Sequence, residues 1–165
     1  MWVLKAQKRD GSGTVDLSSF LDRPIQAYTW RNADSIAATI DSGGVEPIVF
    51  LGVRTPGAQA FRFGGVNNSL TSSVNGNVMA YVHHSANTPS EIYVWTGEET
   101  GGRRLTSHNV ELASQLDLPE MESFTFKGAG GDEVQGWLLR PPGFDANKKY
   151  PVLFLIHGGP QGAWH

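Results

Sequence analysis

Short apolar runs alternate with polar turns along the first 106 residues, and this pattern predicts β-structure. The runs are rich in Val, Ile, Phe, Tyr and Thr, and clusters of Gly, Asn, Asp and Ser separate them at the spacing of antiparallel strands. Asp10-Gly11 stands between two such runs and is a strong hairpin signal. No segment here carries the sustained apolar period of about 3.6 residues that indicates a helix.

The same region contains an internal repeat. "NADSIAATI" (32–40) resembles "VNGNVMAYV" (74–82), and each is followed by a loop and a further strand, "EPIVFLGV" (46–53) and "SEIYVWT" (90–96). A period of about 42 residues with four short strands is typical of a β-propeller blade. Two unrelated hairpins in a β-sandwich are the alternative.

The pattern changes after Thr106. A short helical stretch, Val110 to Leu116, ends at Leu118-Pro119 and indicates a linker. Two alternating runs then flank a Gly-rich turn at 128–132, which predicts a second hairpin. Tyr150 to Ile156 is a continuous apolar run, and such a run favours a strand covered on both faces, as in an α/β sheet.

Composition and charge narrow the classes of function. The 165 residues are 39% hydrophobic and 18% charged, with a net charge of −3, which argues against a nucleic-acid partner. No apolar stretch reaches the length of about 18 residues that a membrane span needs. The chain has no cysteine, which excludes disulfides, thiolate metal sites and a Cys nucleophile. His83-His84 suggests no metal site either, because adjacent residues of a strand point to opposite faces. We expect no metal and no cofactor.

The turn His157-Gly158-Gly159-Pro160 directly follows the apolar run. In an α/β sheet this position is the carboxyl end of a strand, where such sheets bind ligands. Glycines allow a sharp turn and a close approach of backbone N–H groups to a bound oxygen. In α/β-hydrolases a loop of this kind supplies one N–H of the oxyanion hole. The alternative is a tight turn without chemistry.

Residues 74–164 resemble the prolyl oligopeptidase family of serine peptidases, on its acylaminoacyl-peptidase and dipeptidyl-peptidase side. The resemblance is carried by "EIYVWTGEETGGRRLT" and by "LDLPEMESFTFKGAGGDEVQGWLLRPPGFDANKKYPVLFLIHGGPQGAW". It implies a β-propeller that caps an α/β-hydrolase domain. Residues 1–117 would then be the C-terminal blades of the propeller, and residues 118–165 the first part of the hydrolase domain, so the chain itself would be mainly β.

The resemblance also implies an activity. A peptidase of this family hydrolyses short peptides with a Ser-His-Asp triad, and its backbone oxyanion donor corresponds to Gly159. Some branches carry a tyrosine at the first position of the turn, where this chain has His157, to which we give no catalytic role. The chain contains no Gly-x-Ser-x-Gly, so no catalytic residue is expected within it, and we expect an inactive fragment that folds poorly alone. The parent is expected to be soluble, in the cytoplasm or in a periplasmic or secreted compartment.

Two other functions are compatible with these residues. One is a non-catalytic β-repeat binding module in which the His-Gly-Gly-Pro segment is only a turn. The other is an esterase or lipase of the α/β-hydrolase type, and the preceding β-repeats count against it.

Overall fold

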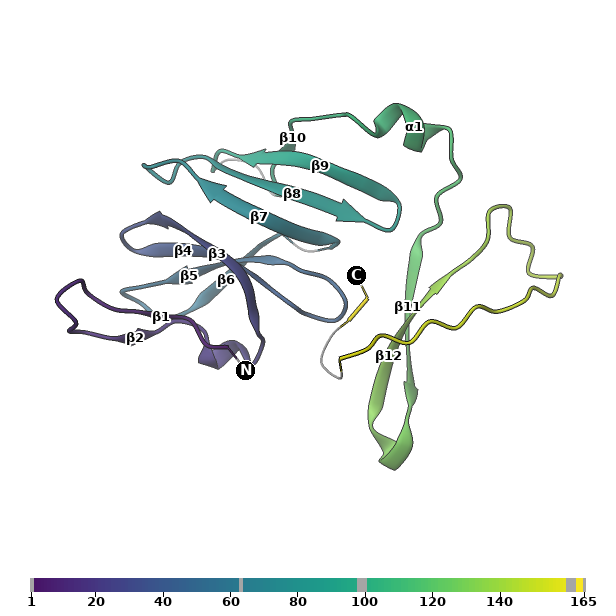
Figure 1. Ribbon diagram of the computed structural model, residues 1–165, viewed down its shortest axis with the longest axis horizontal. Helices are drawn as coiled ribbons and strands as arrows, with labels where there is room; N and C mark the ends of the chain where they lie inside the picture. The colour runs from purple at the N-terminus through teal and green to yellow at the C-terminus, as the bar shows by residue number, and fades with distance from the viewer. Residues whose placement is uncertain (1, 63, 98–100, 160–162, 165) are drawn as a thin grey trace.

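The computed structural model describes residues 2–62, 64–97, 101–159 and 163–164, and these residues are mainly β (Figure 1). Its elements are β1 (Lys5–Ala6), β2 (Val15–Asp16), η1 (Ser19–Leu21), β3 (Ile25–Asn32), β4 (Ser35–Ile40), β5 (Ile48–Gly52), β6 (Ala58–Arg62), β7 (Val66–Ser72), β8 (Met79–Ser85), β9 (Thr88–Trp95), β10 (Arg103–Arg104), α1 (Val110–Ser114), β11 (Met121–Lys127), η2 (Ala129–Gly131) and β12 (Glu133–Leu139).

Two four-stranded antiparallel sheets make up most of the molecule. Their strand orders are β3-β4-β5-β6 and β10-β9-β8-β7, so in each sheet every strand pairs with its neighbour in the chain. These sheets correspond to the two copies of the repeat predicted from the sequence. The four-strand count per copy is therefore confirmed, and every connection within a sheet is a local turn or loop.

The two sheets pack face to face through an aromatic and aliphatic core. Ala37 and Ile48 of the first sheet contact Met79, Tyr81 and Trp95 of the second, and all five side chains are buried. The rings of Phe50 and Phe61 add to this core from the first sheet and stack on each other with centroids 5.1 Å apart. Burial of these side chains is the main force that holds the sheets together.

The opposite face of the first sheet carries a second core. Ile36, Ala38, Val49 and Leu51 are buried there against the β1–β2 segment, which contributes Ala6 and Leu17. The turn between β1 and β2 forms around Asp10-Gly11 as predicted, and the N–H of Gly11 donates to the carbonyl of Lys8 at 2.9 Å.

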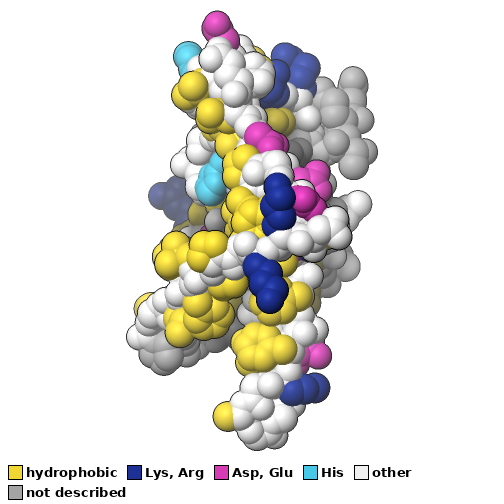
Figure 2. All heavy atoms as spheres, turned by 90° about the vertical axis from the view of Figure 1, so that its right-hand side faces the viewer, with side chains coloured by type: hydrophobic (Ala, Val, Ile, Leu, Met, Phe, Trp, Pro, Cys, Tyr) yellow, Lys and Arg dark blue, Asp and Glu magenta, His cyan; other side chains and the backbone are white. Residues whose placement is uncertain are grey.

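A linker with the short helix α1 leads from the second sheet to the β11–β12 hairpin, which lies to one side of the two sheets in Figure 1. Both the helix and the hairpin were predicted. Figure 2 views the molecule from the hairpin side, where many hydrophobic side chains gather. Exposed hydrophobic residues of the hairpin are Phe124, Phe126, Val134, Leu138 and Leu139.

The strand predicted at 150–156 is not formed. Residues 151–158 have no regular secondary structure, and the side chains of residues 152–156 are 65–86% exposed. A strand needs hydrogen-bonding neighbours on at least one edge, and the described residues offer this segment none. The apolar pattern thus predicted burial that the described part of the chain does not supply.

Candidate functional site

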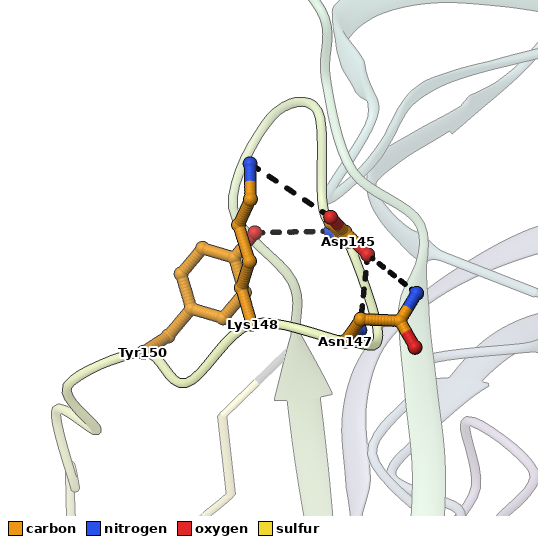
Figure 3. A network of polar contacts seen from close by, with 4 residues as sticks. All are labelled: Asp145, Asn147, Lys148 and Tyr150. Atoms are coloured by element: carbon orange, nitrogen blue, oxygen red, sulfur yellow. Dashed lines mark hydrogen bonds and ion pairs between the residues drawn. The ribbon is translucent and has the colours of Figure 1, made fainter.

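A compact polar loop precedes the apolar run and fixes its start (Figure 3). The carboxylate of Asp145 accepts hydrogen bonds from the backbone N–H and the side-chain amide of Asn147, at 2.9 and 3.1 Å. The N–H of Asp145 donates to the hydroxyl of Tyr150 at 3.0 Å, and Lys148 Nζ lies 3.8 Å from its carboxylate. The hydrogen bond from the N–H of Asn147 to the side chain of Asp145, two residues earlier, is typical of an Asx turn.

The same loop is anchored to the hairpin. Arg140 donates two hydrogen bonds to the carboxylate of Glu122, at 2.5 and 2.9 Å, across the β11–β12 pair. These bonds and the positive charge lower the pKa of Glu122. The guanidinium of Arg140 also lies 4.6 Å from the ring centroid of Phe144, which in turn packs on Tyr150. The end of the hairpin and the start of the apolar run are therefore one connected unit.

The His-Gly-Gly part of the predicted oxyanion loop lies beyond this unit and is exposed. Gly159 has φ +143°, a conformation that L side chains rarely adopt. A Cβ at Gly158 would meet no atom within 4 Å. His157 Nδ1 lies 3.1 Å from the carbonyl of Gly158. Pro160, the last residue of the predicted loop, lies outside the described residues.

The backbone of this turn can take a ligand oxygen. Within the described residues, the N–H groups of Gly158 and Gly159 donate to no protein acceptor. Free N–H groups on a glycine turn bind developing negative charge on oxygen. The arrangement thus offers donors, whereas the sequence has no Gly-x-Ser-x-Gly to supply a nucleophile.

Two cavities lie elsewhere. One, of about 390 Å³, is a hollow open to solvent at the β3–β4 and β7–β8 turns, with Trp30, Asn32 and Ser72 among its lining residues. The other, of about 260 Å³, lies between loops of the two sheets and the β11–β12 hairpin. The His-Gly-Gly turn lines neither of them, so the turn and the cavities are separate features.

Buried polar groups inside the second sheet form a network that the sequence did not reveal. His83 Nδ1 lies 2.9 Å from Asn67 Oδ1, and Asn67 Nδ2 donates to the carbonyl of Glu46 at 2.7 Å. His83 is 7% exposed and packs edge-on against Tyr93. Among the described residues, no three His, Asp or Glu side chains gather closely enough to hold a metal ion. His83 thus contributes a hydrogen bond and a ring contact to the interior of the second sheet.

Glu91 is a second buried polar residue that pattern reasoning missed. The residue is 4% exposed, and its carboxylate accepts hydrogen bonds from the hydroxyl of Thr106 and from the N–H of Asn109, the latter at 2.7 Å. These bonds lower the pKa of Glu91. They tie β9 to the start of the linker. The only sequence signal was a Glu directly before the apolar run Ile92–Trp95 of β9.

No helix in the described part of the chain is long and apolar enough to cross a membrane.

Comparison with known proteins supplies relatives along most of the chain. No protein-family model matches it. A probable dipeptidyl-peptidase 5 of Aspergillus niger is 32% identical over 149 residues, which is 87% of this chain and 20% of that protein. Dipeptidyl-peptidase 5 of Porphyromonas gingivalis is 32% identical over 97 residues, 59% of this chain and 14% of that protein. That of Trichophyton schoenleinii is 59% identical over 57 residues, 34% and 8% of the two chains.

Solved structures share the fold. An acylaminoacyl peptidase of Pyrococcus horikoshii superposes with a TM-score of 0.76 at 23% identity, over 92% of this chain and 23% of that one. Dipeptidyl peptidase 4 of Porphyromonas gingivalis gives a TM-score of 0.66 at 18% identity, over 88% and 21% of the two chains.

The chain thus spans about a fifth of the length of the first of these relatives. The relatives are dipeptidyl-peptidases by name, and the structural neighbours are acylaminoacyl and dipeptidyl peptidases. They confirm the resemblance seen in the sequence. The chain is similar to peptidases of the prolyl oligopeptidase family, on the dipeptidyl-peptidase and acylaminoacyl-peptidase side.

Proposed function

We propose that this chain is part of a serine oligopeptidase that hydrolyses peptide bonds in short peptides. The observation that carries the proposal is the match to a probable dipeptidyl-peptidase 5 along 87% of the chain. In this proposal residues 1–117 are C-terminal blades of a β-propeller. Residues 118–165 begin an α/β-hydrolase domain, and peptides are cleaved between the two.

The roles of the turn residues follow from the same proposal. The backbone N–H of Gly159 would stabilise the oxyanion of the tetrahedral intermediate, and Gly158 would allow the turn that aims it. His157 and Pro160 would shape the loop. The Ser-His-Asp triad would lie outside these 165 residues, so the 165-residue chain alone would be inactive. Two face-to-face four-stranded sheets, followed by a hairpin and the His-Gly-Gly turn, support this order of parts.

A fluorophosphonate probe, which reacts with activated serines, tests the proposal. We expect it to label one serine of the full-length protein and none in the 165-residue chain. Labelling together with dipeptide release from a peptide substrate supports a peptidase, whereas labelling with ester hydrolysis alone indicates an esterase. A full-length protein without any labelled serine is a binding module, and the proposal then fails.

Two glycine variants of the full-length protein test the oxyanion role. An alanine at Gly159 is strained at φ +143° and turns its N–H away, so Gly159→Ala should lower kcat by about a hundredfold. Gly130→Ala is the matched control, because Gly130 also has a positive φ, +74°, its Cβ meets nothing within 4 Å and it lies outside the turn, so this variant should keep most of the activity. Equal losses in both variants would contradict the assignment of Gly159.

A further inference from the structure

The β11–β12 hairpin touches the sheets at a Gly-Gly turn between β4 and β5. Ser42 and Val45 pair across this turn, and Gly43 and Gly44 have φ +63° and +75°. Positive φ at both central residues is what a type I′ hairpin turn requires. The turn is therefore a rigid projection of the first sheet.

Two side chains of the β11–β12 hairpin contact this β4–β5 turn. Gln135 Nε2 donates to the carbonyl of Gly43 at 2.8 Å and also to the hydroxyl of Ser123 at 3.0 Å, which fixes the amide. The indole of Trp137 lies directly over Gly44, because a Cβ added there would fall 2.5–2.7 Å from three indole atoms. We call Gly43, Gly44, Gln135 and Trp137 the latch.

The latch is an isolated contact. Within the described residues, the bond from Gln135 to Gly43 is the one hydrogen bond between the hairpin and the two sheets. The bond from the N–H of Gly143 to Asp117 joins the hairpin's exit to the linker and reaches neither sheet.

Beside the latch, the space between the hairpin and the loops of the two sheets is open rather than filled by side chains. The cavity of about 260 Å³ has Gly44 and Val45 of the β4–β5 turn, Gly65 of the connection between the sheets and Asn87 of the β8–β9 turn on one side. Glu120, Met121 and Trp137 line its other side. One close contact next to an unfilled space leaves the hairpin room to rotate about the latch. Because Arg140, Phe144 and Tyr150 tie the hairpin to the start of the apolar run, such a rotation would carry the His-Gly-Gly segment with it.

We propose that the latch sets the spacing between the sheets and the segment that carries the His-Gly-Gly turn. Gln135 and Trp137 are then positioning residues, and the latch fixes how wide the peptide-binding space between the two parts opens. The second statement rests on the proposed function; the first does not.

Gly44→Ala in the full-length protein tests the spacing. The alanine methyl would have to push the indole from about 2.5 Å to an ordinary contact of about 3.5–4.0 Å. Gly130→Ala is the matched control, because Gly130 has almost the same φ, +74°, with no atom within 4 Å of an added Cβ. Both variants carry the same backbone strain, and only Gly44→Ala moves Trp137.

Spin labels report the spacing without any need for activity. Exposed Val74 on the β7–β8 turn and exposed Lys127 on β11 are changed to cysteine in a background without other cysteines, and the distance distribution between the labels is measured. We expect a shifted or broadened distribution in Gly44→Ala, no change in Gly130→Ala, and recovery when Trp137→Phe is added to Gly44→Ala. An unchanged distribution in Gly44→Ala would overturn the proposal.

The second arm compares kcat/KM for a chromogenic dipeptide substrate and for a longer peptide. We expect Gly44→Ala to change the ratio of the two by about threefold or more, with hinge-type changes in kcat and KM together, and Gly130→Ala to leave it unchanged. A shifted distance with an unchanged ratio would refute control over the peptide-binding space. A wild-type protein without peptidase activity would refute the proposed function and leave the distance result to decide the spacing.

Discussion

At the scale of single residues, Arg31 is the most unusual side chain of the sheet core. Its guanidinium carbon lies 4.1 Å from the ring centroid of Phe50 and 4.5 Å from that of Trp95, so it joins the two sheets by cation–π contacts. Its Nε is buried and has no hydrogen-bond partner among the described residues. Loss of water on burial lowers the pKa of Arg31. Cation–π contacts and a hydrogen bond from Nη1 to the Ser35 hydroxyl at 3.5 Å, rather than an ion pair with a described residue, hold this cation in place.

This arrangement predicts that Arg31→Lys destabilises the fold more than Arg31→Met. A lysine ammonium is strongly hydrated and cannot stack as a plane, whereas methionine keeps the apolar stem and makes favourable contacts with aromatic rings. We expect Arg31→Lys to cost about 1–2 kcal/mol and Arg31→Met less. Thermal unfolding of the full-length protein measures the order. A less stable Arg31→Met than Arg31→Lys would mean that the charge itself matters.

Glu91 gives a prediction with a pH dependence. Its folded pKa is lowered, chiefly by hydrogen bonds from Thr106 and Asn109. The carboxylate therefore stabilises the fold at pH values above the ordinary glutamate pKa of about 4.3, and this contribution is lost as the pH falls through the lower folded value. Glu91→Gln should be less stable than wild type at neutral pH, and the difference should shrink in acid.

Melting temperatures of both proteins at neutral and acidic pH check this expectation. Glu133→Gln is a suitable control, because Glu133 is exposed on the hairpin, and its effect should be small at both pH values. If Glu91→Gln lowers the melting temperature by the same amount at neutral and acidic pH, then Glu91 stabilises the fold through its shape and not through its charge.

At the scale of elements, the β7–β8 turn fits tightly against the end of β3. Gly76 has φ +72°, and a Cβ there would lie 1.8 Å from the carbonyl oxygen of Arg31. Gly76→Ala should therefore separate the inner edges of the two sheets and cost more than about 2 kcal/mol. Gly11→Ala, with φ +84° and open space around it, should cost only about 1 kcal/mol. Unfolding curves of the two full-length variants compare them directly, and equal costs would rule out the steric cause.

The elements differ in whether the sequence alone could predict them. Strands β3 to β10 and the β11–β12 hairpin were predictable as a repeat and a hairpin, because each pairs with a chain neighbour across a Gly- or Asn-rich turn. The latch was not, because Gln135 and Gly43 are 92 residues apart and carry no shared pattern. The strand expected at 150–156 was wrong for this chain. An apolar run predicts that its side chains are buried, but it does not predict which part of the protein covers them. The oxyanion role of Gly159 stays a prediction.

At the scale of the whole molecule, the exposed run 152–156 predicts self-association of the 165-residue chain. Contiguous exposed apolar residues without charge or internal proline are an aggregation hazard. Leu153→Lys together with Leu155→Lys should reduce both the binding of a hydrophobic dye and the mass measured by sedimentation. Val74→Lys, at an exposed turn outside the run, should change neither. A wild-type chain that sediments as a monomer without binding the dye would disprove the prediction.

The local order of the sheets has a consequence for synthesis on the ribosome. Strands β3 to β6 complete their ladder within residues 25–62, and β7 to β10 complete theirs within residues 66–104, so each sheet has all its partners as soon as it leaves the exit tunnel. The second sheet can dock on the first before the hairpin is made. The run at 152–156 emerges after both sheets and without a partner among the described residues already made, so it is the segment of this chain most in need of a chaperone at that moment.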